Sequence, residues 1–162
     1  MDRTQLEHEL QTLHPQSYGW ALSCCQRDTH LAREALQQAY LKVLEGKAQF
    51  RGQSSFKTWF FAVIRFTAID LMNQEARLAN RKAPLFEPQA DDPDAKNSTD
   101  WTHLRQAIAN LPDKQREILH LVFYQGLTLD EAAHVMQVAP GTARQHYHRA
   151  KTKLKNQLQA KP

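Results

Sequence analysis

A group of basic and amide side chains near the C-terminus has the residue types and spacing that bind duplex DNA. Between Pro140 and the end of the chain there are six Lys or Arg and no Asp or Glu. Arginine can bond guanine O6 and N7, glutamine can bond adenine, and lysine can neutralise phosphates. A basic helix face can also be merely solvated, so the helix and turn before it must decide between this alternative and DNA binding. The predicted DNA-binding residues are Thr142, Arg144, Gln145, His148, Arg149 and Lys151.

Two predicted helices would position this basic face. Thr128 and Glu131 have the spacing of a capping box, so a helix begins there. A tight turn at residues 138–141 follows, and Pro140 suits the first position of a second helix. Small residues would let the two helices approach closely, and the second helix has an apolar face of Ala143, Tyr147, Ala150, Leu154 and Leu158. The pattern is typical of a helix-turn-helix.

A second candidate site lies in the loop at residues 46–56 and at the start of the helix after it. A protein that binds an unpaired base typically uses positive charge, amides and an aromatic ring. The ring can stack on any base, and hydrogen bonds to the edge of the base then select one. The alternative is a polar connector whose Phe50 packs into the core. The candidates are Lys47, Gln49, Phe50, Arg51, Gln53, Ser54, Ser55 and Trp59.

Composition favours a globular protein of one or two small cores. The chain has 162 residues, 41% of them hydrophobic, and a net charge of +4. No early stretch has the apolar length of a signal peptide or membrane span, so we expect a cytoplasmic protein with no membrane contact. Cys24 and Cys25 are adjacent and expected to be reduced; a redox switch or metal site is the less favoured alternative. We expect no metal, no cofactor and no enzymatic activity.

The periodicity predicts an all-α fold with no strands. Short helices are expected at 6–13 and 18–25, separated by Pro15, and longer ones at 30–44 and 56–79. Residues 83–100 contain three prolines and five acids, which is typical of a linker that divides the chain in two. Beyond it the pattern predicts helices at 101–111, from Pro112 to Gly126, and in the helix-turn-helix.

Two segments resemble one family. LPDKQREILHLVFYQGLTLDEAAHVMQVAPGTARQHYHRAKTKL is similar to region 4 of bacterial sigma factors, and FRGQSSFKTWFFAVIRFTAIDLM resembles the end of region 2 in the extracytoplasmic-function (ECF) group of the sigma-70 family. The resemblance implies two small helical domains joined by an acidic linker. Region 2 would occupy residues 1–82, the linker 83–100, and region 4 with its helix-turn-helix 101–162.

The resemblance also implies partners and a mechanism. Region 2 would bind the β′ clamp of core RNA polymerase and the melted −10 strand, and region 4 would bind the β flap and the −35 duplex. The linker would follow the RNA path of the polymerase. Implied polymerase-binding residues are Glu34, Gln37, Gln38, Tyr40 and Leu41. An anti-sigma factor is a further possible partner, and a helix-turn-helix regulator that acts without polymerase is the alternative function.

The chain departs from the family pattern at this polymerase-binding helix. The family usually carries an acidic run resembling DAEDLVQE, whereas residues 31–38 here read LAREALQQ and only Glu34 keeps its charge. Lost complementary charge could remove on the order of 1 to 5 kcal/mol from docking. We hypothesise that a Ser/Thr kinase supplies negative charge near this surface, at Thr58 first, with Ser54 and Ser55 as further candidates. Equal polymerase affinity of the wild type, Thr58→Glu and Thr58→Ala would contradict this.

Overall fold

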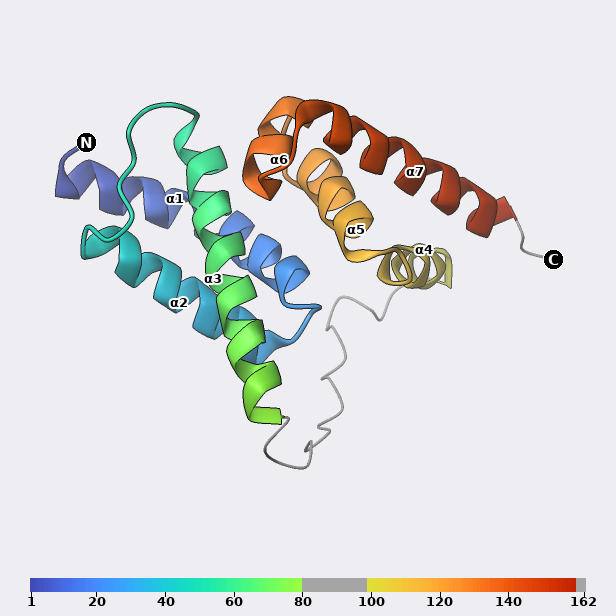
Figure 1. The fold of residues 1–162 in the computed structure, drawn as a ribbon, viewed down its shortest axis with the longest axis horizontal. Helices are drawn as coiled ribbons and strands as arrows, with labels where there is room; N and C mark the ends of the chain where they lie inside the picture. Colours follow the sequence, from blue (N-terminus) through green and yellow to red (C-terminus); the bar gives the residue numbers. More distant parts are fainter. Residues whose placement is uncertain (80–98, 160–162) are drawn as a thin grey trace.

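The computed structural model describes residues 1–79 and 99–159, and this part of the chain is helical without strands. The all-α prediction is therefore confirmed, while most of the predicted linker at 83–100 lies outside the described residues. No described helix is long and apolar enough to cross a bilayer. The helices are α1 (Arg3–Cys24), α2 (Thr29–Leu44), α3 (Phe56–Ala79), α4 (Thr99–Ala109), α5 (Asp113–Leu119), the π-helix η2 (His120–Tyr124), α6 (Leu129–Met136) and α7 (Pro140–Gln159) (Figure 1).

The N-terminal half is a three-helix unit of α1, α2 and α3. The prediction that Pro15 separates two short helices was wrong, because α1 runs through it without a break. Proline removes the hydrogen bond to the carbonyl four residues earlier. Here that carbonyl belongs to Gln11, and both Gln11 and Pro15 lie on the exposed side of the helix, where water can replace the lost bond. Burial of Leu10 and Trp20 holds both parts of α1 against its neighbours.

Helices α2 and α3 follow the predicted pattern closely. The side chain of Asp28 caps α2 by accepting from the Leu31 amide at 3.1 Å. Helix α3 has the predicted bounds and buries Phe60, Phe61 and Ile64 completely. Since adjacent helical residues point about 100° apart, α3 must be covered on more than one side.

The C-terminal half consists of α4 to α7. Helix α4 begins two residues before its predicted start. The segment after Pro112 is not one regular helix, since it changes from α5 into the π-helix η2 at His120. The predicted turn between the last two helices is confirmed: α6 ends at Met136, its C-cap Gln137 adopts the left-handed conformation, and α7 begins at Pro140.

The two halves share one hydrophobic core. Buried residues of α1 and α3, such as Trp20 and Phe61, belong to the same cluster as Ile118, Leu121 and Met136 of the C-terminal half. Figure 1 shows α6 beside the first half of α3, and α1 also contacts α5 and η2. The two units are thus consecutive in sequence, and in space they pack directly on each other.

Candidate nucleic-acid interface

Helix α7 presents the predicted DNA-binding side chains to solvent. Arg144, Gln145, His148, Arg149 and Lys151 are all exposed, and Thr142 is half-buried. On the opposite side of the helix, Ala143 and Ala150 are fully buried. The apolar residues thus fix the rotation of the helix and leave its basic side free. Leu158, predicted as part of the apolar side, is 40% exposed.

The capping box that was predicted to begin the helix-turn-helix is confirmed by its geometry. The Glu131 amide donates to Thr128 Oγ1 at 3.1 Å, and the Thr128 amide donates to Glu131 Oε1 at 3.0 Å. These bonds satisfy two helix-terminal amides and lower the pKa of the Glu131 carboxyl. Ala132, Ala133 and Ala143 are buried where α6 meets α7, as the close approach of the two helices requires.

The charged groups of α7 have few partners that would compete with a phosphate. Arg144 Nη1 lies 3.9 Å from Asp130 Oδ1, and both side chains are mostly exposed. Lys151 Nζ lies 5.0 Å from the centre of the Tyr147 ring. His146 is half-buried, and this burial, with Lys114 and Arg149 nearby, lowers its pKa. The exposed side of α7 therefore keeps a positive field suited to DNA.

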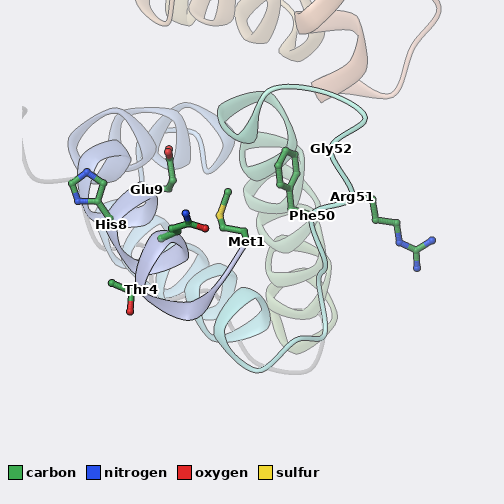
Figure 2. Close-up of a pocket in the computed structure, with 8 residues that line it drawn as sticks. Met1, Thr4, His8, Glu9, Phe50, Arg51 and Gly52 are labelled. Carbon is green, nitrogen blue, oxygen red and sulfur yellow. The ribbon is translucent and has the colours of Figure 1, made fainter.

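The second candidate site borders an open groove between the start of α1 and the loop at residues 46–55. Its lining includes Met1, His8, Phe50, Arg51 and Gly52 (Figure 2). Figure 2 shows the Phe50 ring close to α3 and the Arg51 side chain directed outward to solvent. Gly52 adopts a φ of +74°, in the left-handed region that favours glycine, and so lets the loop turn directly after Arg51.

Phe50 is half-buried and packs on the core, as the connector alternative predicts in part, while base binding by this loop stays a prediction. Its ring centre lies 5.5 Å from those of Phe56 and Trp59, and the cluster packs on the core. Of the remaining candidates in the loop, Lys47, Gln49, Arg51, Gln53 and Ser55 are exposed and Ser54 is half-buried. The loop is thus anchored by the aromatic cluster of Phe50, Phe56 and Trp59, and its polar side chains lie around this cluster.

The candidate phosphorylation sites differ in access. Thr58 is 1% exposed, and its hydroxyl lies between Ser55 Oγ, at 2.9 Å, and Glu131 Oε2, to which it donates at 3.3 Å. A kinase cannot reach this hydroxyl while α6 covers it. Ser55 is exposed, and its Oγ caps α3 by accepting from the Thr58 amide at 3.1 Å. Ser54 donates to the Ser55 carbonyl at 3.1 Å.

The predicted polymerase-binding residues lie along α2 with unequal exposure. Gln37 and Leu41 are exposed, whereas Glu34 and Gln38 are half-buried. The Tyr40 hydroxyl lies 2.6 Å from His14 Nδ1, and its ring stacks on His14 and Phe60. Burial raises the pKa of Tyr40 to about 12. Tyr40 therefore joins α1 to α2 and α3 and presents only part of its ring to a partner.

The two cysteines are buried thiols. Burial, with Glu117 as the next cause, raises the pKa of Cys24, and burial raises the pKa of Cys25 to about 12. A thiol reacts as its thiolate, so these environments make both side chains unreactive. Among residues 1–79 and 99–159, no group of His, Cys, Asp or Glu is arranged to hold a metal ion.

Sequence reasoning missed a set of residues that join the two halves. Lys57 donates to the Gln125 carbonyl at 2.7 Å, and Arg65 pairs with Glu117 at 3.1 Å. The Gln125 side chain donates to the Gln16 carbonyl at 3.1 Å. The available signal was the adjacent pair Phe60 and Phe61, because two large rings 100° apart require a second covering surface on α3.

These features define an all-helical, two-part DNA-binding protein, and comparison with known proteins identifies its family. The family model for sigma-70 region 2 matches residues 10–78, and the model for sigma-70 region 4 matches residues 107–156. Together they cover most of the chain, in the order expected. The chain therefore belongs to the sigma-70 family, in its ECF group, as the resemblance implied.

Related proteins and structures agree with this assignment. The chain is 26% identical to the RNA polymerase sigma factor YlaC of Bacillus subtilis, with 92% of this chain and 91% of that protein covered. It is also 26% identical to the ECF RNA polymerase sigma-E factor of Haemophilus influenzae, with 78% and 74% covered. In fold it is similar to the sigma factor RpoE of Bartonella quintana in complex with the anti-sigma factor NepR, with a TM-score of 0.81, 23% identity, and 98% and 99% of the two chains covered.

Proposed function

We propose that this chain directs core RNA polymerase to specific promoters and begins transcription initiation as an ECF sigma factor. The observation that carries this proposal is the exposed, acid-free side of α7, held by a capped helix-turn-helix, in one chain with a region 2 unit. Region 2 alone or a helix-turn-helix alone would be compatible with other functions. Their combination in this order is what supports a promoter-recognition factor.

Region 4 would place α7 in the major groove of the −35 element. Arg144 and Gln145 lie near its N-terminal end, where recognition helices contact base edges. His148, Arg149 and Lys151 follow on the same exposed side and would contact bases or phosphates. Thr142, at the first turn, would donate its hydroxyl to a phosphate. The weak contact between Arg144 and Asp130 leaves that guanidinium available to guanine.

Region 2 would bind the unpaired −10 strand along the loop at residues 46–55. A base could enter the groove beside Phe50 while Arg51, directed to solvent, meets the backbone phosphate (Figure 2). Lys47, Gln49, Gln53 and Ser55 are exposed around this path and would add phosphate and base-edge contacts. The half-buried Trp59, whose ring contacts that of Phe50, would hold the Phe50 ring in place.

Core polymerase would dock on α2 through its β′ clamp, and the β flap would contact region 4. Gln37 and Leu41 are the exposed members of the predicted set, with Glu34 and Gln38 beside them. Because Glu34 is the single acid in residues 31–38, we propose that added negative charge strengthens docking. A phosphate on exposed Ser55 would supply it directly, whereas one on buried Thr58 requires α6 to move away first.

An anti-sigma factor is the other regulator that we propose, supported by the similarity to a sigma factor solved with NepR and to CnrH solved with the cytosolic domain of CnrY, the latter with a TM-score of 0.69. Co-purification with the tagged full chain would distinguish regulation by an anti-sigma factor from regulation by phosphorylation. A bound protein that dissociates when the polymerase is added indicates an anti-sigma factor. A mass increase of one phosphate on a Ser54 or Ser55 peptide indicates a kinase.

In vitro transcription tests the proposed function. The purified chain and core polymerase are added to a library of promoter fragments, and start sites are mapped. Defined starts that need both components are expected, and they should disappear for an Arg144→Ala, Gln145→Ala double variant. The alternative, a helix-turn-helix regulator independent of polymerase, predicts a DNA footprint by the chain alone. Absence of any start site with core enzyme would overturn the proposal.

A further inference from the structure

The groove beside Phe50 has a second wall, formed by the first turns of α1 (Figure 2). We call this the α1 wall; it consists of Met1, Gln5 and Glu9. Gln5 and Glu9 are four residues apart, so they lie one above the other on the same side of the helix. Figure 2 shows the Met1 side chain between Glu9 and Phe50. The open groove has a volume of about 820 Å³, which is enough for one nucleobase.

A capping box fixes the start of the α1 wall. The Gln5 amide donates to Asp2 Oδ1 at 2.8 Å, and the Asp2 amide donates to Gln5 Oε1 at 3.2 Å. The second bond occupies the side-chain oxygen of Gln5 and leaves its Nε2 group as a donor. In the next turn, burial of Leu10 and Leu13 fixes the rotation of α1 against its neighbours. Glu9 is therefore held at the groove by packing on the other side of its helix.

Glu9 is the acid of this wall. It is half-buried, and no side chain among residues 1–79 and 99–159 bonds to it or pairs with it. Glu7, two residues earlier, differs in both respects, since it is exposed and its carboxylate accepts from Arg3 Nε at 3.1 Å. A carboxylate can only accept hydrogen bonds, and a covered one needs donors in place of the water it has lost. Glu9 is therefore ready to accept from a group that enters the groove.

The charges around the groove define how a nucleotide would enter it. Arg51 is directed outward to solvent, and Lys47 of the same loop is exposed, so this side attracts phosphate (Figure 2). Glu9 lies on the α1 side, where its negative charge repels phosphate. A nucleotide would thus enter with its phosphate toward Arg51 and its base toward α1. Phe50 and the exposed thioether of Met1 can then contact the faces of the base.

The chemistry of a carboxylate separates thymine from the other bases. Cytosine, adenine and guanine each carry an exocyclic amine, and a glutamate commonly accepts from the amine of cytosine. Thymine carries no exocyclic amine. Its one ring N–H lies between two carbonyl oxygens, and these would repel a carboxylate that approached it. A groove with Glu9 at the base edge should therefore accept an amine-bearing base and reject thymine.

We propose that Glu9 is a specificity-determining residue of the −10 site, because its carboxylate accepts from the exocyclic amine of the base in the groove and so excludes thymine at that position. This inference rests on the proposed function, since it assigns a reader to the base that region 2 would bind. Gln5 Nε2 would donate to an acceptor on the same base edge. The start of α1 thereby joins a site that the loop at residues 46–55 would otherwise form alone.

The affinity of the polymerase complex for promoter DNA with an unpaired −10 strand tests the role of Glu9. The promoter comes from the start-site mapping described above, and each −10 base is replaced in turn by the other three. The test variants are Glu9→Gln, which keeps the shape of the side chain and removes its charge, and Glu9→Ala. The matched control is Glu7→Gln, which removes an exposed carboxylate from the same helix. Helical content from circular dichroism shows that each variant is folded.

At one −10 position the wild type and the control should bind thymine on the order of tenfold more weakly than cytosine or adenine. Glu9→Gln should reduce this difference to about twofold or less, because a neutral amide can donate to thymine O4 as well as accept from an amine. A favoured base that lacks its exocyclic amine should bind the wild type on the order of tenfold more weakly than the intact base. The same analogue should cause no loss with Glu9→Ala, where the partner of the amine is already absent.

Unchanged base preferences in both Glu9 variants, with normal promoter binding, would overturn this inference and leave the proposed function standing. An equal loss on all four bases would also overturn it, since Glu9 would then contact a protein partner or support the fold. Failure of the wild type to select any promoter with core polymerase would contradict the proposed function, and the role of Glu9 with it.

Discussion

Acidification should weaken the junction between the two halves through His120. This side chain stacks between Trp20 and Tyr124, at 5.5 and 5.3 Å between ring centres. Its Nε2 lies 3.0 Å from the Gln125 amide nitrogen, which also donates to the Gln16 carbonyl. A neutral imidazole can accept from that amide, but an imidazolium would face it as a second donor. Protonation therefore removes a hydrogen bond in a buried place.

The lowered pKa of His120 sets how much the free energy of unfolding falls on acidification. Burial, and then the nearby charges of Arg27 and Lys57, lowers the pKa of His120 to about 4, from an ordinary value of 6.5. Between pH 6.5 and 4 the unfolded chain therefore holds a proton that the folded chain lacks, and the free energy of unfolding falls as the pH drops through this window. The stabilisation is fully present above pH 6.5. From pH 7 to pH 5 the expected loss is about 2 kcal/mol.

Urea unfolding at pH 7 and pH 5 measures this loss, with His120→Gln as the control that cannot titrate. Glu117, whose pKa is raised by burial, and Glu131, whose pKa is lowered by the Thr128 bonds, titrate in both proteins, so the difference between the two isolates His120. The wild type should lose about 2 kcal/mol more than the variant over this range. Equal losses in the two proteins would refute the assignment of a buried neutral imidazole.

Three further predictions concern the DNA-binding helices. Thr128→Ala should cost about 1 to 2 kcal/mol in urea unfolding, because it removes the cap that accepts from Glu131, and Thr128→Ser should restore most of it. In promoter binding by the polymerase complex, Gln145→Ala should lose about 1 to 3 kcal/mol at one −35 base pair and relax its specificity; equal loss on all sequences would contradict a base contact. Lys151→Ala should weaken binding uniformly and reduce the salt slope by about 1, and an unchanged slope would contradict a phosphate contact.

Local chemistry accounts for what the sequence predicted well. The Thr128 and Glu131 capping box, the turn before Pro140 and the exposed basic side of α7 depend on contacts between near neighbours, and the structure confirms the geometry of each. Pro15 was different, because a proline interrupts a helix only when the lost bond cannot be replaced. Here the packing of the residues before and after it outweighs its local preference.

The contact between the halves could not be predicted from periodicity. The π-helix at His120–Tyr124 departs from the regular α-helical register, and His120, its first residue, stacks on Trp20. Thr58 was predicted as a phosphorylation site, which requires access to solvent, whereas Thr58 and its neighbour Lys57 both contact the C-terminal half. A polar residue has no sequence signature that separates a distant protein partner from water. Long-range contacts of this kind require the tertiary structure.

The polar character of this contact makes it specific more than it makes it stable. A buried ion pair contributes little net stability, because the attraction between Arg65 and Glu117 is offset by the cost of removing both from water. Removal of one partner alone is different, because the other charge would then stay buried without compensation. The pair therefore fixes how the two halves pack against each other, since each charge must meet its partner where both leave water.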